Sequence, residues 1–370
     1  MQKYTFSKEN SLALKGTAIL MMMWHHCFLI GRFEKYSISF WPMTEGQVVC
    51  IADFLKICVS LFAFISGYGL YRTWTAAQQK EQSTSRWIYE RLVRTLSSYW
   101  FVIVLAWLVC TFLDNRPYRI YNFATSILLG IWNMIVDFLG LTNLVGGVQL
   151  NPTWWYMSAA VVFIVLFPLI VKAFKGVGCF CTLGIILILP RISDGYPGGI
   201  NFYSFLPVFC IGMIFARYDF FAIWGRLWSN RTIYIQVSKL IIMLAGLLII
   251  YKLFPLMDVE KWWDVKWNLF PILVIIFAYD YLFKIPILNE TLIFLGKHAT
   301  NIFLVHAFIR YYYCEAFVYG RGNFIFIIGT LLLTSLGLSI VIEGLKKLLH
   351  YEAGINRLLL YRARSSSKSG

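Results

Sequence analysis

Residues 12–30 read LALKGTAILMMMWHHCFLI, an apolar run long enough to cross a bilayer as one α-helix. The run contains Lys15, His25 and His26 but no small-residue site at which a signal peptidase would cut. We therefore expect a retained membrane-spanning helix rather than a cleaved signal peptide. Ionisable groups inside a spanning helix are costly, so these three side chains are the first candidates for function.

The composition of the whole chain agrees with a membrane protein. Of the 370 residues, 59% are apolar and 14% are charged, against about a quarter charged in an ordinary soluble domain. The net charge of +15 lies in short basic clusters between long apolar runs, which is typical of cytoplasmic membrane loops and argues against nucleic-acid binding. The 8 cysteines lie almost all inside apolar runs, so we interpret them as buried thiols.

Further apolar runs follow along the chain, and the backbone polar groups of each span must be satisfied inside its own helix. The predicted fold class is therefore all-α, a polytopic transmembrane helix bundle with about ten spanning helices. An eleventh apolar stretch, 122–142, contains Asn133, Asp137 and several glycines. The predicted spans are residues 12–31, 48–71, 95–113, 153–172, 177–190, 202–216, 232–254, 267–283, 298–314 and 324–345.

Loop charges decide whether the eleventh stretch crosses the membrane. The basic loop 72–94 belongs in the cytoplasm by the positive-inside rule, which leaves the loop 32–47 outside. All later basic loops also fall inside only if 122–142 does not cross, so we predict a re-entrant or interfacial segment there. Both termini are then cytoplasmic, with residues 1–349 forming one transmembrane domain and 350–370 a basic tail.

The first helix places Lys15 and His26 on one face. They are eleven positions apart, close to three turns, which separates them by about 16 Å along the helix axis. His25 points about 100° away from that face, toward lipid or a packing neighbour. A histidine facing the bundle interior can act as a general base near neutral pH, so His26 is a candidate catalytic residue. The alternative is that both histidines only hydrogen-bond a neighbouring helix.

The second predicted span carries further candidate groups. Asp53 and Lys56 are three positions apart, and either they pair with each other or Asp53 orients His26 across the helix interface. Further along the same span, residues 64–69 read FISGYG. Its small residues allow close approach either of another helix or of a ligand.

Three other positions complete the set of candidates. Arg91 and Arg94 lie on one helical face at the start of the third span, where they suit either phosphate groups or topology and lipid headgroups. His306, in a later span, either lines the same cavity as His26 or is structural. Trp155 fits an interfacial aromatic belt and is a candidate substrate contact.

In their order and spacing these motifs resemble the acyltransferase-3 family of integral membrane O-acyltransferases, over most of the chain. The resemblance rests first on Lys15 and His26, which are separated by ten residues. The other matching segments are FISGY at 64–68, RLVRTL at 91–96, NPTWWYMS at 151–158, FLPVFCIGMIFAR at 205–217 and GKHATNIFLVH at 296–306.

The resemblance implies an enzyme that takes an acyl group, usually acetyl, from cytoplasmic acyl-CoA. It passes the group to a hydroxyl of a glycan, a lipid-linked sugar or another cell-envelope acceptor. In that reaction a histidine either deprotonates the acceptor hydroxyl or carries the acyl group briefly. No metal is expected, because a thioester donor is already activated, and membrane lipids are the expected surroundings. With the candidates above, the expected site comprises His26, Lys15 and Asp53 for catalysis, Ser66, Gly67, Tyr68, Arg91 and Arg94 for acyl-CoA, and His25, His306 and Trp155 for substrate.

Two departures from the family pattern are visible. The family often has arginine where Lys15 stands, and proline where Ser97 and Ser98 follow the two arginines. Two alternative functions stay open: a secondary transporter or flippase-like protein for a sugar or anionic substrate, and a membrane sensor or assembly factor. Transporters usually show matched repeats with broken helices, and we detect none in the sequence. Acyl-CoA hydrolysis or transfer by the purified protein separates the enzyme from both.

Overall fold

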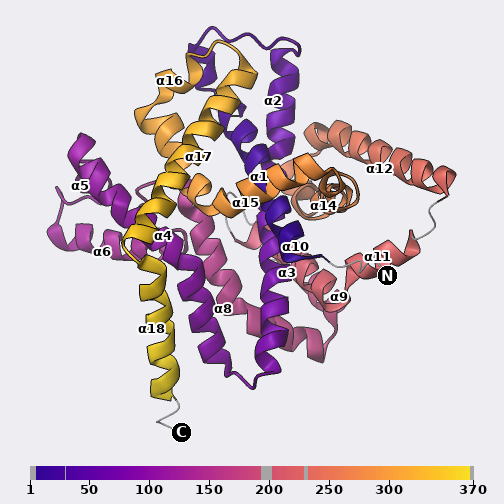
Figure 1. The fold of residues 1–370 in the computed structure, drawn as a ribbon, viewed down its shortest axis with the longest axis horizontal. Helices are drawn as coiled ribbons and strands as arrows, with labels where there is room; N and C mark the ends of the chain where they lie inside the picture. Colours follow the sequence, from indigo (N-terminus) through magenta and orange to yellow (C-terminus); the bar gives the residue numbers. More distant parts are fainter. Residues whose placement is uncertain (1–5, 30, 193–201, 229–231, 367–370) are drawn as a thin grey trace.

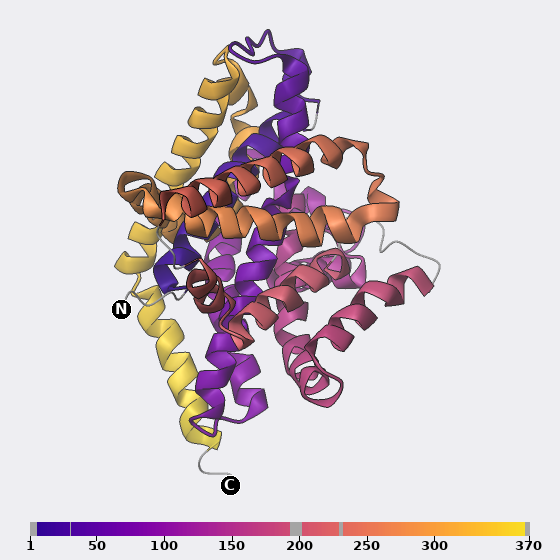
Figure 2. The ribbon, with the colours of Figure 1, turned by 90° about the vertical axis from the view of Figure 1, so that its right-hand side faces the viewer.

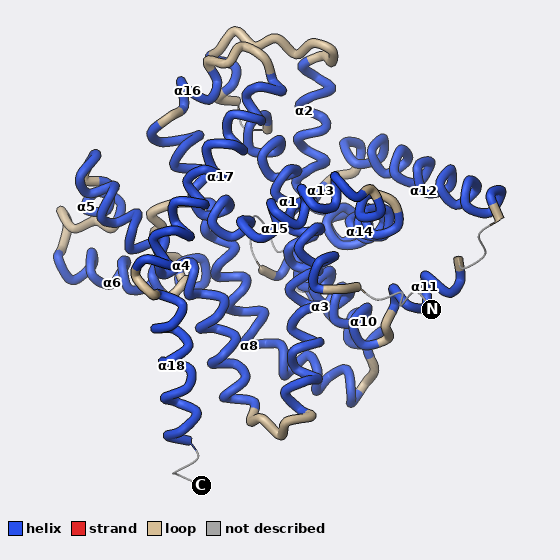
Figure 3. Tube along the Cα trace, viewed as in Figure 1, coloured by secondary structure: helices blue, strands red, loops and turns tan. Residues whose placement is uncertain are grey.

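The computed structural model describes residues 6–29, 31–192, 202–228 and 232–366. These residues form helices joined by loops, with no strand among them (Figure 3). The nearest approach to a sheet is an isolated bridge between Ser39 and Asn323. The all-α class predicted from the apolar runs is therefore confirmed.

Seven helices of the described chain are long and apolar enough to cross a membrane, or eight if α10 (Leu206–Arg217) and α11 (Phe220–Leu227) form one bent span. This count lies below the ten expected. The seven are Glu45–Gln78 (α2, Glu45–Phe54, with α3, Cys58–Gln78), Thr84–Asp114 (α4), Pro152–Gly176 (mostly α8, Trp155–Gly176), Ile233–Leu256 (mostly α12, Ile233–Leu253), Val259–Lys284 (including α14, Phe270–Asp280), Pro286–Tyr313 (α15, Pro286–Ala307, with η8, Phe308–Tyr313) and Phe324–Leu348 (α17).

Length and polarity explain the lower count. Helix α9 (Cys179–Ile192) has 14 residues, which span about 21 Å and fall short of the roughly 30 Å hydrocarbon core. The chain bends by 68° between α10 and α11. Helix α1 (Lys8–Phe28) stays outside the set because Lys15 and its two histidines lower its mean hydropathy.

The stretch 122–142 contains only short helices. Helix α6 (Ile127–Phe138) has 12 residues, so its length of about 18 Å cannot cross the bilayer. Its neighbours α5 (Arg116–Ile120) and α7 (Thr142–Val145) are shorter still. This agrees with the prediction that the segment does not span.

Two pairs of helices approach so closely that only glycine fits at the crossing. A Cβ atom at Gly16 of α1 would overlap the carbonyl oxygen of Leu292 in α15, and one at Gly296 would overlap that of Leu12. Helices α3 and α10 make the same reciprocal contact at Gly67 and Gly212. Close packing at small residues is how membrane helices associate when no hydrophobic force drives them together.

The two ends of the molecule are well separated. Helix α2, helix α16 (Glu315–Tyr319) and the loop after α1 lie at one end, at the top of Figure 1, while α18 (Tyr351–Ser366) extends from the other. The loop between α3 and α4 lies at the same end as α18 in both views (Figures 1 and 2). Much of the predicted tail 350–370 is thus helical, and Tyr351 ties it to α4 by donating to the Ser97 carbonyl at 2.8 Å.

The long helices do not all share one direction. Helices α12 and α14 lie side by side and cross the direction of α4 and α8 (Figures 1 and 2). Helix α12 leaves Ile241, Ile242 and Leu248 exposed. An apolar outer surface of this kind is what a helix in contact with lipid presents.

Candidate active site

A polar cavity lies between α1, α3, α4, α8 and α15 and has a volume of about 580 Å³. Its charged side chains are all cationic, two histidines lie among them, and none of the described residues that line it is Asp or Glu. Aromatic rings form much of the remaining wall. The basic lining residues are Lys15, His25, His26, Lys56, Arg94 and Arg310, and the main aromatic ones are Phe62, Trp155, Tyr156, Trp267, Phe303, Tyr311 and Tyr312.

The close crossing of α1 and α15 brings two imidazoles together. His26 follows Gly16 by ten positions, and His306 follows Gly296 by the same number. The ring centroids of His26 and His306 are 4.8 Å apart, so the two helices run in the same general direction from the crossing. His26 lines the cavity, whereas His306 is fully buried and lies behind it.

The hydrogen bonds of His306 fix its tautomer. Its Nδ1 lies 2.7 Å from the carbonyl oxygen of Phe303, and because a carbonyl can only accept, Nδ1 must carry the proton. The Nε2 of His306 is then an acceptor, and it is buried without a hydrogen-bond partner among the described residues. The Nδ1 of His26 is likewise shielded and unpaired. The facing imidazoles therefore hold unused hydrogen-bonding capacity, which is unusual for buried polar atoms.

His25 is held from a different direction. Its Nδ1 donates to the Ala52 carbonyl of α2 at 2.7 Å, and its ring centroid lies 5.1 Å from that of His26. The packing neighbour expected for this histidine is thus the backbone of α2. His25 also lines the cavity, as a substrate contact would.

Asp53 does not reach His26. It lies half-buried on α2, outside the cavity lining, and no hydrogen bond joins the two side chains within the described chain. Its charge instead interacts with those of Lys56 and Lys266. The position that Asp53 was expected to occupy behind His26 is taken by His306.

The expected acyl-CoA residues divide into two groups. Ser66 and Arg94 line the cavity, as does Lys15. Gly67 packs against the backbone of α10, and Tyr68 is buried, where its hydroxyl accepts from Arg72 at 3.2 Å. These two residues lie outside the cavity lining.

Arg91 also lies outside the cavity lining. It is half-buried, and its Nε has no partner among the described residues. Arg94, one turn further along α4, is exposed to the cavity. Of the two arginines predicted to share a helical face, only Arg94 therefore lines the cavity.

The structure adds residues that our reading of the sequence missed. Arg310 is 2% exposed and lies one turn beyond His306 in the same span, in the π-helical turn η8. An arginine in the run FLVHAFIRYYY is a visible signal, because charges inside spans are rare and mark function. Guanidinium groups stack on the two tyrosines that follow it. The Cζ atom of Arg32 lies 3.3 Å from the ring centroid of Tyr311, and that of Arg116 lies 3.5 Å from the ring centroid of Tyr312.

The short-helix segment around α6 holds one wall of the cavity in place. The carboxylate of Asp137 accepts from the hydroxyls of Tyr99 at 2.9 Å and Tyr121 at 2.6 Å, and from the Leu150 amide at 2.9 Å. The next residues in the chain, from Asn151 onward, line the cavity. Asp137 thus anchors the start of the segment that carries Trp155.

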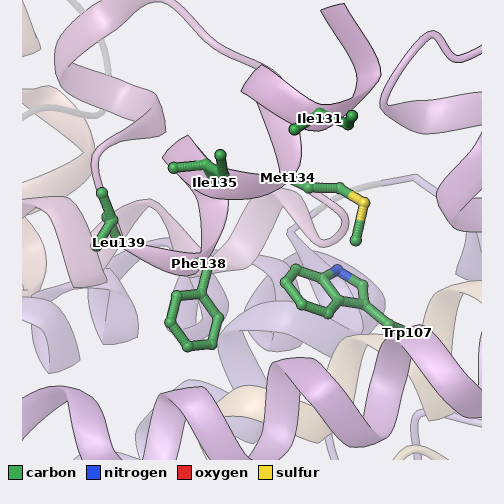
Figure 4. Close-up of a pocket in the computed structure, with 6 residues that line it drawn as sticks. All are labelled: Trp107, Ile131, Met134, Ile135, Phe138 and Leu139. Atoms are coloured by element: carbon green, nitrogen blue, oxygen red, sulfur yellow. The ribbon is translucent and has the colours of Figure 1, made fainter. Parts of the chain in front are cut away.

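A second hollow, of about 440 Å³, lies between α4 and α6 (Figure 4). Trp107, Met134 and Phe138 are among the side chains around it, and none of its lining residues is ionisable. It offers no group for acid, base or nucleophilic chemistry. The candidate active site is therefore the polar cavity at His26.

Comparison with known protein families gives one result that covers nearly the whole chain. The model of the acyltransferase-3 family, described as an acyltransferase domain, matches residues 12–344. Comparison with curated proteins gives no match, and comparison with solved structures gives none either. The match includes most of α1, all of α15 and every residue that lines the cavity. The resemblance drawn from the motifs is confirmed, and the chain belongs to the acyltransferase-3 family and is a multi-pass membrane acyltransferase.

Proposed function

We propose that the chain moves an acetyl group from cytoplasmic acetyl-CoA to a hydroxyl of a glycan or another cell-envelope acceptor, with His26 as general base. One observation carries this proposal: the only histidine pair with free buried nitrogens in the described chain lies at the cavity that also holds Arg94 and Lys15. A phosphate-bearing donor and a base are the two things that such a transfer needs.

The orientation follows from charge. The basic loop 72–94 and the C-terminal helix α18 lie at the same end of the molecule (Figures 1 and 2), and the positive-inside rule puts that end in the cytoplasm. Arg94 lies in the first half of α4, whose first residue Thr84 follows the loop between α3 and α4, and Lys15 lies in the first half of α1. Acyl-CoA from the cytoplasm would thus meet these two cations first.

The distance between the proposed phosphate-binding residues and the proposed base suits the length of acetyl-CoA. The charged phosphates of acetyl-CoA lie at the far end of its pantetheine arm from the thioester. Lys15 and His26 are about 16 Å apart along α1, so phosphates at Lys15 and Arg94 leave the arm to run past Ser66 toward His26. A cavity of about 580 Å³ shared with an acceptor leaves room for a short acyl group.

The proposed reaction is one acyl transfer. His26 removes the proton of the acceptor hydroxyl, the oxygen attacks the thioester carbonyl, and the carbon–sulfur bond breaks. The leaving CoA thiolate takes the proton that His26 holds. Behind His26, the unprotonated Nε2 of His306 can accept a hydrogen bond from the Nδ1–H of His26. The lone pair of His26 Nε2 then faces the hydroxyl of the acceptor substrate. His306 is a positioning residue in this scheme.

The test is acyl transfer by the purified full-length chain, supplied with radiolabelled acetyl-CoA and a cell-envelope glycan fraction. We expect labelled ester on the glycan, and slow hydrolysis of acetyl-CoA when no acceptor is added. His306→Phe keeps a ring in place but removes the acceptor nitrogen, and should lower kcat and shift its pH profile while KM for acetyl-CoA stays unchanged. Uptake of a sugar or anion by vesicles containing the protein, with no ester formed, would identify a transporter instead.

A further inference from the structure

Arg310 is a buried cation whose charge is not matched. Its side chain is 2% exposed and lines the cavity, and it forms no ion pair with a carboxylate of the described residues. One guanidinium nitrogen, Nη1, donates to the Tyr319 hydroxyl at 3.3 Å, while Nε has no hydrogen-bond partner. Burying a charge without a partner is strongly unfavourable. An anion in the cavity would remove this cost.

The neighbours of Arg310 hold it on one side only. The Tyr319 hydroxyl donates to the Cys27 carbonyl of α1 at 3.1 Å, so it is left to accept from the guanidinium. These two hydrogen bonds hold Arg310 next to the end of α1 that carries His25 and His26. Among the remaining donors of the guanidinium, Nε has no hydrogen-bond partner within the described chain, and the residue lines the cavity.

A second cation stands at the same end of the cavity. Lys56 lines the cavity, and its Nζ lies 4.4 Å from the ring centroid of Trp267. Asp53 is close enough to interact with it, but forms no ion pair within 4 Å among the described residues. Lys56 and Arg310 both interact electrostatically with His25. The histidine end of the cavity therefore carries two cations and no lining carboxylate.

The acyl donor cannot neutralise this end. Lys15 is about 16 Å from His26 along α1, so phosphates held at Lys15 and Arg94 lie away from the histidines. The oxyanion of the tetrahedral intermediate is negative only during the reaction, so it does not balance a charge that is present in the resting protein. The molecule that enters beside His26 is the acceptor.

We propose that the acceptor is anionic and that Arg310 and Lys56 bind its carboxylate or phosphate beside the hydroxyl that is acylated. This inference rests on the proposed function and narrows its acceptor to sugars, or similar polyols, that carry a negative charge. Guanidinium groups bind carboxylates and phosphates through paired hydrogen bonds. The indole of Trp267 and the ring of Tyr312 give the sugar flat apolar faces near these cations.

The test uses three probes that differ at one position: methyl β-D-glucoside, its glucuronide and its 6-phosphate. Binding is measured on the purified full-length chain without donor, and transfer is measured with acetyl-CoA. We expect at least one anionic probe to bind about tenfold or more tightly than the glucoside. The glucuronide and 6-phosphate arms show which anion the site prefers.

Variants assign the preference to the cations. Lys56→Gln should reduce the preference for the anionic probe over the glucoside about tenfold. The protein should still fold, because the Lys56 side chain is only half-buried. Lys252→Gln removes an exposed charge on α12 outside the cavity, and should change nothing. Arg310→Lys keeps a charge at the buried site and should weaken binding of the anionic probes alone.

The outcomes separate this inference from the proposed function. Selective binding of an anionic probe without transfer supports the anion site and contradicts the acyltransfer chemistry proposed at His26. Equal binding of all three probes, or none by either anionic probe, overturns the anion site. So does a loss of transfer in the Arg310 variant that is equal for neutral and anionic probes, since the residue would then stabilise the oxyanion.

Discussion

At the scale of single residues, two adjacent histidines should have unequal roles. His26 faces the cavity with His306 behind it, whereas the Nδ1 of His25 is tied to the Ala52 carbonyl. Loss of a general base costs about 10²–10⁴-fold in rate, so His26→Ala should be nearly inactive although it inserts and folds. His25→Ala loses one hydrogen bond, worth about 1 kcal/mol of stability, and should keep substantial turnover. Acetyl transfer and thermal unfolding in detergent measure the two effects.

The contrary results are equally informative. An active His26→Ala protein would refute the general-base mechanism. If both variants are inactive but well folded, His25 and His26 act as a unit, and the argument that only the cavity-facing histidine is catalytic is wrong.

The two arginines of α4 should also differ. Arg94 lines the cavity and Arg91 does not. A hydrogen bond to a charged group contributes about 1.5–3 kcal/mol, so Arg94→Gln should weaken acetyl-CoA binding by about tenfold or more, and Arg91→Gln by much less. Binding of acetyl-CoA to the inactive His26→Ala protein measures this without turnover. Equal losses in the two variants would mean that donor phosphates extend beyond the cavity, along the arginine face of the helix.

At the scale of helices, the crossing of α1 and α15 should control both folding and activity. Gly16→Ala would push a methyl group into the Leu292 carbonyl, and overpacking of this kind costs about 1–3 kcal/mol. Because the same crossing brings His26 to His306, activity should fall along with the unfolding temperature. Gly337→Ala in α17 is the matched control, since a Cβ there meets nothing within 4 Å and alanine favours a helix. Loss of stability in both variants would remove the crossing as the cause.

The sequence predicts these helices better than it predicts their contacts. Apolar length and loop charge were enough for the membrane class and for the short segment around α6, because both depend on local composition. They overcounted spans at α9 and at the bend after α10, where length and geometry matter more than polarity. Gly16 and Gly296 are 280 positions apart, so no local sequence pattern predicts that their helices cross at these residues.

The same limit applies to the candidate site. His26 and Lys15 could be predicted at a common cavity because motif and helical face agree for both, whereas Ser66 and Arg94 were predicted there from the family motifs. The choice between Asp53 and His306 as neighbour of His26 depends on how far α2 rotates against α1, which the sequence does not encode locally. Arg310 was detectable as a charge within a span, but its missing counter-charge appears only in three dimensions.

At the scale of the whole molecule, the two ends should lie on opposite sides of the membrane. Thr84 lies at the α3–α4 end and Glu45 begins α2 at the other, and both are exposed. A membrane-impermeant maleimide added outside should label Glu45→Cys and leave Thr84→Cys unmodified until the membrane is opened. Replacing the exposed Cys181 and Cys314 by serine removes background labelling. The opposite pattern would invert the topology and place Arg94 and Lys15 away from cytoplasmic acyl-CoA.

The equal chain lengths from Gly16 to His26 and from Gly296 to His306 have a consequence for relatives of this enzyme. One added or deleted residue in either segment would turn the following histidine by about 100° and move it by about 1.5 Å, away from its partner. In related sequences, the residues between each glycine and its histidine should therefore tolerate substitutions but not insertions or deletions. A homologue with a single-residue gap in only one segment would have lost the imidazole pair, whatever residues it keeps elsewhere.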